Sequence, residues 1–164
     1  MTLDNIQLPS IVLHGLYKHS LVDLEIESQS TPPPITFQVL GNNGKNILII
    51  VETDEAIYLP DEQLNFLLGI LSACNLNMAD VAIFNLKNNI QVNYKTLATE
   101  LRPEKILLFG IKPEQIALPL DFPHYQIQQF NNQTYLTAPM LSILQDNKVE
   151  KVKLWNCLKQ IFAI

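Results

Sequence analysis

The stretch Asn46-Ile47-Leu48-Ile49-Ile50-Val51 decides the fold that is predicted for this chain of 164 residues. Residues 47–51 are five consecutive apolar side chains, four of them β-branched. Such a run has no polar face to turn toward water, so it predicts a strand buried on both faces in the middle of a parallel sheet. Two further runs, Lys105–Phe109 before Gly110 and the weaker Val81–Phe84, predict neighbouring strands.

Helical patterns alternate with these strands. A helix is predicted over residues 61–74, capped by Asp61, and another over residues 94–101, ended by Pro103. The remaining predicted elements are a short helix at 113–117, a hairpin or two late strands within 125–137, and a final helix over 148–162 whose inner stripe is Val152, Trp155, Leu158 and Phe162. This alternation is typical of an α/β domain, in which sites form in the loops that leave the carboxyl ends of the strands.

The first 44 residues lie outside the alternation. Within residues 1–28, one helical face can hold Ile11, Val12, Leu16 and Tyr17, and this segment is predicted either to dock on the body of the domain or to bind a partner. Residues 29–34 contain three consecutive prolines and predict a linker, 35–40 can add an edge strand, and 41–44 has the composition of a turn. The predicted organisation is a tail or docking segment at 1–28, a linker and turn at 29–44, and a folded domain at 45–164.

Composition and charge narrow the class of protein. The net charge is −5, whereas proteins that bind nucleic-acid phosphates usually carry a basic excess, so strong direct nucleic-acid binding is not expected. No apolar run approaches the roughly 20 residues of a membrane-spanning helix, and no cleavable leader pattern opens the chain, so a cytoplasmic protein without a membrane partner is predicted. Cys74 and Cys157 lie in apolar helical patterns and are predicted to be buried free thiols.

Motifs that carry chemistry are sparse in this sequence. His14, His19 and His124 have no metal-ligand spacing, and neither a Gly-rich phosphate loop nor a Gly-x-Ser-x-Gly elbow is found. Glu52, Asp54 and Glu55 follow the first predicted buried strand, where a carboxylate can activate water or hold a metal. The simpler interpretation is that these acids are solvated in a polar loop, because no histidine or lysine partner is expected in a matching loop.

Several motifs resemble the uracil-DNA glycosylase superfamily over roughly residues 45–162. Residues 46–74 and the stretch Arg102-Pro103-Glu104-Lys105-Ile106-Leu107-Leu108-Phe109-Gly110 resemble its early part. The stretch Thr137-Ala138-Pro139-Met140-Leu141-Ser142-Ile143-Leu144, followed by Asn147, Lys151, Leu154-Trp155 and Leu158-Lys159, is similar to its ending. That ending is more similar still to the non-enzymatic psi subunits of bacterial DNA polymerase III, in which a Ser/Ala-Pro-x-Leu turn leads to an Asn and a Leu-Trp helix. The resemblance implies a three-layer α/β/α domain around a central, mainly parallel four-stranded sheet.

The chain departs from active glycosylases where their chemistry lies. Those enzymes have a Gly-rich water-activating loop after the first strand, whereas this chain reads Glu52-Thr53-Asp54-Glu55-Ala56. They also carry a His-Pro-Ser motif, whereas this chain reads Ala138-Pro139-Met140, which cannot stabilise charge on a departing base. No polar side chain is identified in register to bind the edge of a flipped base. Asp54, Glu55, Ala138, Pro139 and Met140 are therefore predicted to mark a vestigial pocket, with no catalytic residue, metal or cofactor.

The resemblance to psi subunits implies an adaptor in DNA replication. In that family an N-terminal segment docks on the clamp-loader ATPase, and the folded domain holds the chi subunit, which contacts single-strand-binding protein. Ile11, Val12, Leu16 and Tyr17 would then bind the clamp loader, and a chi-like subunit is a second expected partner. Two alternatives stay open: a divergent glycosylase in which Asp54 or Glu55 activates water, and an interaction domain that uses the same scaffold for an unrelated partner.

Overall fold

The computed structural model describes residues 37–89 and 91–164, which belong to a unit that extends from Phe37 to Ile164. The predicted docking segment at 1–28, with Ile11, Val12, Leu16 and Tyr17, lies outside the described residues. The Pro-rich part of the predicted linker at 29–44 does so as well.

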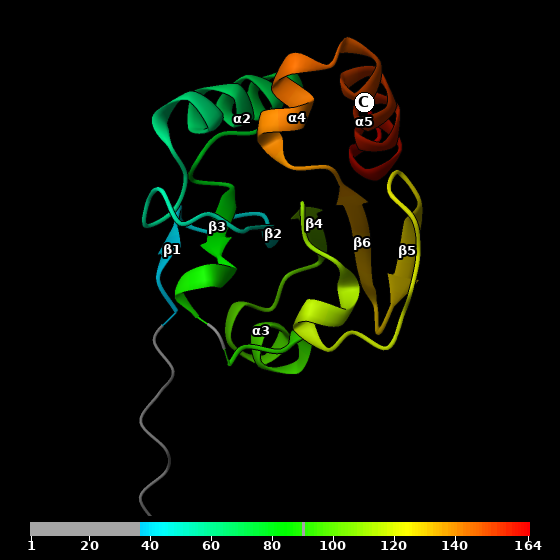
Figure 1. Ribbon diagram of the computed structural model, residues 1–164. Coiled ribbons are helices and arrows are strands. Elements are labelled where there is room, and N and C mark those ends of the chain that lie inside the picture. Colours follow the sequence, from blue (N-terminus) through cyan, green and yellow to red (C-terminus); the bar gives the residue numbers. More distant parts are fainter. Residues whose placement is uncertain (1–36, 90) are drawn as a thin grey trace, which may run out of the picture. The chain divides into compact units, whose positions relative to one another are not determined.

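A mixed six-stranded sheet forms the centre of this unit (Figure 1). Its strands are β1 (Val39–Leu40), β2 (Ile47–Val51), β3 (Val81–Asn85), β4 (Lys105–Phe109), β5 (Ile127–Phe130) and β6 (Gln133–Ala138). In the order β1-β3-β2-β4-β6-β5, the four central strands are parallel, and β1 and β5 run antiparallel at the two edges. The predicted α/β class is confirmed, whereas the predicted number of four strands is wrong, because two short edge strands with incomplete burial extend the parallel core.

Strand β2 lies in the middle of the sheet, as predicted, and all five of its residues are buried. It pairs with β3 on one side and with β4 on the other. Because side chains alternate along a strand, Ile47, Ile49 and Val51 enter one hydrophobic core and Leu48 and Ile50 enter a second core on the opposite face.

Helices cover both faces of the sheet. The α-helices are α2 (Asp61–Ala73), α3 (Tyr94–Leu101), α4 (Leu141–Asp146) and α5 (Lys148–Phe162), and the 3-10 helices are η1 (Leu86–Asn88) and η2 (Pro113–Ile116). Helices α2, α4 and α5 pack on the core that contains Ile49, while α3 and η2 pack on the core that contains Ile50 (Figure 1). Among the described residues, every helix is too short or too polar to cross a membrane.

Helix α3 has the predicted bounds because its ends are encoded locally. The side chain of Asn93 accepts a hydrogen bond from the backbone N–H of Thr96 at 2.9 Å, which caps the first turn. Arg102 ends the helix in the left-handed conformation just before Pro103. The prediction that Asp61 caps α2 is wrong, because Pro60 occupies the cap position and Asp61 is the first helical residue, where its carboxylate still favours the positive helix end.

The buried face of α5 differs from the predicted stripe. Of the predicted stripe, Leu158 is buried and Trp155 and Phe162 are partly buried against the core, whereas Val152 is 51% exposed. Leu154 and Cys157, which lie outside the predicted stripe, are also buried. Apolar residues occur on two adjacent faces of this helix, so helical spacing alone did not show which face packs on the sheet. The predicted burial of Cys157 as a free thiol, like that of Cys74, is confirmed, and burial raises the pKa of both thiols.

Two glycines provide a matched test of the fold. Gly41 has φ +105°, and a Cβ added there would lie 2.2 Å from the carbonyl oxygen of Val81, whereas a Cβ added at Gly69, in the middle of α2, meets nothing within 4 Å. We expect Gly41→Ala to lower the free energy of unfolding by about 3 kcal/mol, because it adds backbone strain and a backbone clash. Gly69→Ala should raise it by about 1 kcal/mol, because alanine favours a helix. Urea denaturation of both variants measures these effects, and equal responses would contradict the geometry at Gly41.

Candidate functional site

The loops that leave the carboxyl ends of the four parallel strands meet at one edge of the sheet. Residues 52–60 follow β2, η1 follows β3, residues 110–117 follow β4, and residues 139–140 lead from β6 into α4. Sites in parallel sheets form at this edge, and the sequence places the candidate carboxylates there.

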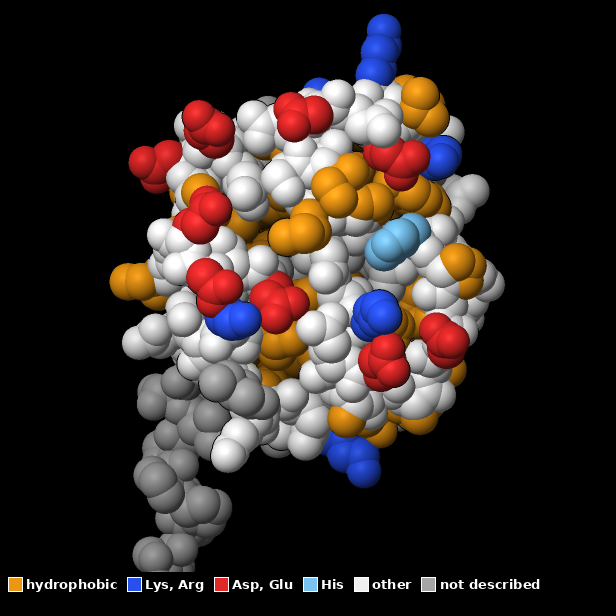
Figure 2. Space-filling view, viewed as in Figure 1, with side chains coloured by type: hydrophobic (Ala, Val, Ile, Leu, Met, Phe, Trp, Pro, Cys, Tyr) orange, Lys and Arg blue, Asp and Glu red, His pale blue; other side chains and the backbone are white. Residues whose placement is uncertain are grey.

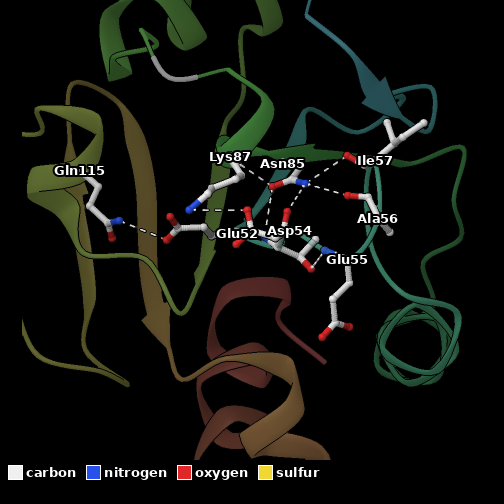
Figure 3. A network of polar contacts seen from close by, with 9 residues as sticks. Glu52, Asp54, Glu55, Ala56, Ile57, Asn85, Lys87 and Gln115 are labelled. Atoms are coloured by element: carbon white, nitrogen blue, oxygen red, sulfur yellow. Dashed lines mark hydrogen bonds and ion pairs between the residues drawn. The ribbon is translucent and has the colours of Figure 1, made fainter.

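Asn85, the last residue of β3, organises the loop after β2 (Figure 3). Its side chain is 1% exposed, and its Nδ2 donates to the carbonyl oxygens of Thr53 at 2.9 Å, Ala56 at 3.2 Å and Ile57 at 3.1 Å. Its Oδ1 accepts from the backbone N–H of Thr53 at 3.2 Å and of Lys87 at 3.1 Å. An amide group offers two N–H donors and two acceptor lone pairs, so the protein itself uses the full hydrogen-bonding capacity of this side chain.

The carboxylates of the same loop point to solvent or to other loops. Asp54 Oδ1 lies 3.6 Å from Lys87 Nζ, and the Asp54 side chain is 76% exposed. Glu52 accepts a hydrogen bond from Gln115 Nε2 at 3.2 Å, and Glu55 points away from the network in Figure 3. The expectation that no lysine stands in a matching loop is wrong, because adjacent β2 and β3 bring Lys87 beside Asp54. An exposed ion pair contributes about 0–1 kcal/mol, so it orients the loop weakly.

The segment at the end of β6 fills space at the same edge. Ala138 is buried in the core beneath α4, and its carbonyl oxygen accepts a hydrogen bond from the Gly110 N–H at 2.8 Å. Met140, which is 47% exposed, lies over the end of β4, because a Cβ added at Gly110 would stand 2.4 Å from Met140 Cγ. Pro139 is half-buried between them. Within the described part of the chain, Ala138 thus belongs to the core, Met140 covers Gly110, and Asp54 faces Lys87, so these candidates lie in different surroundings.

Carboxylates dominate the charge at this edge. Glu55, Asp61, Glu62 and Asp146 line one hollow of about 360 Å³ between the start of α2 and the end of α4. In Figure 2, Asp and Glu side chains are spread over the whole face that is viewed, with apolar side chains and a few Lys or Arg side chains between them. The acidic residues of these loops and helix ends are Glu52, Asp54, Glu55, Asp61, Glu62, Glu114 and Asp146, against the lysines Lys87 and Lys112. A surface of this sign repels a phosphate backbone.

No group of three or more potential metal ligands is found among residues 37–89 and 91–164.

A second hollow, of about 650 Å³, lies between η2 and the connection that leads to β5. His124 and Thr137 are among its lining residues. Next to His124, the Tyr125 hydroxyl donates a hydrogen bond to the Glu150 carboxylate, which also accepts one from Lys153 Nζ at 2.9 Å. The hydrogen bond from Tyr125 attaches the connection to α5. The hydrogen bond from Tyr125, then that from Lys153, lowers the pKa of Glu150, while burial and the Glu150 contact raise the pKa of Tyr125.

Sequence reasoning missed Asn85, which the structure makes the central polar residue of this edge. The available signal was a single amide at the end of an otherwise apolar run, but the predicted strand stopped at Phe84. The bonding partners of Asn85 in the 53–57 loop are 28 to 32 residues away in the sequence, so their approach depends on strand order.

Asn85→Ala tests whether this amide is structural. We expect a loss of about 3 kcal/mol in the free energy of unfolding, because several partly buried backbone groups lose their partner. Asn88→Ala is the control: Asn88 also donates to Ile57 O, at 2.8 Å, but this hydrogen bond is exposed, so its loss should cost less than about 1 kcal/mol. An Asn85→Ala protein as stable as the parent would show instead that the hydrogen bonds of this amide do not stabilise the loop.

Glu150→Gln tests the hydrogen bond between Tyr125 and Glu150 of α5 through the pH dependence of the protein's stability. The folded-state pKa of Glu150 lies below its ordinary value of 4.5, so the carboxylate stabilises the folded state above that pH. This contribution is lost as the pH falls through the folded-state pKa. The parent should therefore exceed Glu150→Gln in stability at neutral pH, and the difference should vanish in acid. Thermal unfolding between pH 2 and 7 measures it, and a difference that does not depend on pH would refute this assignment.

No protein-family model matches this sequence, and a search of curated proteins finds no match to it either.

Proposed function

We propose that this chain is a non-catalytic, psi-like accessory subunit of the DNA polymerase III holoenzyme, an adaptor that binds the clamp loader. The observation that carries the proposal is the state of the Asn85 amide, whose donors and acceptor are all used by the protein's own backbone. An enzyme that reads a nucleobase needs polar groups left available for the edge of the base. At this edge the buried amide holds a loop instead.

The acidic edge of the sheet supports the same proposal. A glycosylase has to bring a phosphate backbone against its active site, and electrostatic repulsion from the loop carboxylates opposes such an approach. Asp54, the candidate water-activating residue, is exposed and paired with Lys87, a setting that suits solubility better than catalysis. These contacts favour a protein partner over a nucleic-acid substrate.

The C-terminal motif behind the resemblance has a structural basis in this chain. Ala138 ends β6, Met140 stands at the N-cap of α4, and Asn147 caps α5 through hydrogen bonds from the backbone N–H groups of Val149 at 3.0 Å and Glu150 at 3.3 Å. The motif thus builds the strand–turn–helix–helix corner. The finer description of the domain, a uracil-DNA glycosylase-like scaffold in three layers, is part of this proposal and agrees with helices on both faces of the sheet.

Affinity purification tests the proposal directly. Tagged full-length chain, recovered from the source cells in gentle salt, should bring clamp-loader subunits with it, and a chi-like subunit where one exists. Deletion of residues 1–28, or joint replacement of Ile11, Val12, Leu16 and Tyr17 by alanine, should abolish the recovery of the clamp loader. Asp54→Ala is the matched control and should leave the recovery unchanged. An eluate without clamp-loader subunits would overturn the assignment.

A base-release assay separates the adaptor from a divergent glycosylase. The full chain is incubated with uracil- and hypoxanthine-containing DNA, and no release above the buffer level is expected. Release that disappears in Asp54→Ala or Glu55→Ala would replace the proposed function by an enzymatic one.

A further inference from the structure

An apolar groove runs between α2 and α5, away from the loops of the candidate site. It has a volume of about 340 Å³, and its walls are mostly apolar, with Phe66 and Ile70 on α2 and Trp155 on α5. All three of these side chains are partly buried against the core and partly open to the groove. A groove between two helices of three or four turns has the shape that accepts a third, amphipathic helix.

Gly69 leaves a gap in the wall of this groove. It lies in the middle of α2, and a Cβ at this position would meet nothing within 4 Å. A glycine in a helix interior costs about 1 kcal/mol relative to alanine, and the packing of the described residues gives no reason for it. An open stretch of helix backbone allows the close approach of another chain. Gly69 therefore fits a surface that is covered in a complex.

The charge at the groove is positive, although the chain as a whole carries −5. Lys151 Nζ lies 5.3 Å from the ring centroid of Phe66, and Lys159 Nζ lies 5.5 Å from that of Trp155. Neither ammonium group forms an ion pair with a carboxylate among the described residues, unlike Lys153, which pairs with Glu150. Two cations held over aromatic rings at the rim of an apolar groove complement an apolar segment flanked by carboxylates.

We propose that this groove docks an acidic amphipathic helix of a partner protein. Apolar side chains of that helix, spaced i, i+3/i+4 and i+7, would enter between Phe66, Ile70 and Trp155, with its backbone close to Gly69. Its carboxylates would meet Lys151 and Lys159. This inference rests on the proposed adaptor function, to which it adds a second binding surface, distinct from the segment assigned to the clamp loader.

The fluorescence of Trp155 reports on the groove directly, because it is the single tryptophan of the chain. The probe is a 15-residue helix-forming peptide with leucine at the i, i+3/i+4 and i+7 positions and glutamate elsewhere, titrated into the full-length protein. Two control peptides carry lysine in place of glutamate, or serine in place of leucine. The acidic amphipathic peptide should shift the emission to shorter wavelength in a saturable manner, and each control should bind at least tenfold more weakly.

Variants of the protein locate the binding. Gly69→Leu fills the groove with a side chain for which the helix has room, and it should abolish the fluorescence response while the chain stays folded. Gly69→Ala adds only a methyl group where the backbone of the partner is expected to lie, so it should weaken peptide binding less than Gly69→Leu does. Joint substitution of Lys151→Glu and Lys159→Glu should lower the affinity for the acidic peptide by about tenfold, as expected for the loss of two partly exposed ion pairs. The same variant should bind the lysine peptide more tightly than the parent does.

Several outcomes would overturn the inference. These are no saturable response up to about 1 mM peptide, equal binding of the acidic and lysine peptides, or unchanged binding by Gly69→Leu. If sedimentation shows that the parent is a dimer and that Gly69→Leu is a monomer, the groove binds a second copy of the chain instead. If the protein recovers the clamp loader but binds no peptide, the proposed docking groove is refuted and the psi-like assignment stands. If it binds the peptide but recovers no clamp loader, the psi-like assignment is refuted and the docking groove stands.

Discussion

The side chains of Ile49 and Ile50 point to opposite faces of the sheet, and neither is exposed to water. Burying each stabilises the fold by roughly 1.5–3 kcal/mol, but only if both faces of the sheet are covered. Helices α2, α4 and α5 cover one face, while α3 and the segment around η2 cover the other. The position of every loop at the carboxyl edge follows from this central strand, because its parallel neighbours end beside it.

At that edge the polar groups satisfy one another. The Asn85 amide binds the backbone of the 53–57 loop, Glu52 contacts Gln115, and Met140 lies over Gly110. What faces water is a mixture of carboxylates and scattered apolar side chains. The helical layer on one face differs, because it combines half-buried aromatic rings with lysines that have no carboxylate partner among residues 37–89 and 91–164. The two regions therefore differ: the first holds the fold, and the second is the surface proposed to contact another protein.

The predictable parts of this fold were those encoded by neighbouring residues. Continuous apolar runs located β2 and β4, and α3 was found because its apolar residues follow the helical spacing and Pro103 marks its end. Edge strands β1 and β5 lie in segments for which an edge strand and a hairpin were predicted, but they are short and partly exposed, and the four-stranded sheet implied by the resemblance left them out. The buried face of α5 was predicted only in part, because apolar residues occupy two faces of this helix. The network of Asn85 and the contact between Asp54 and Lys87 could not be predicted without the order of the strands.

The turn that follows β1 is bonded to the loop before β3: Asn43, Gly44 and Lys45 donate backbone hydrogen bonds to the carbonyl oxygens of Val81, Ala79 and Asp80 at 3.0, 2.8 and 2.9 Å. The chain that precedes Phe37 enters the domain through β1. Any mechanical load that reaches the domain along that chain is therefore carried first by a two-residue edge strand and then by these bonds in turn. Tension on this edge would act first on β3, the parallel strand that pairs with β1, and would reach β2 only after the contacts of β1 and of the turn had broken.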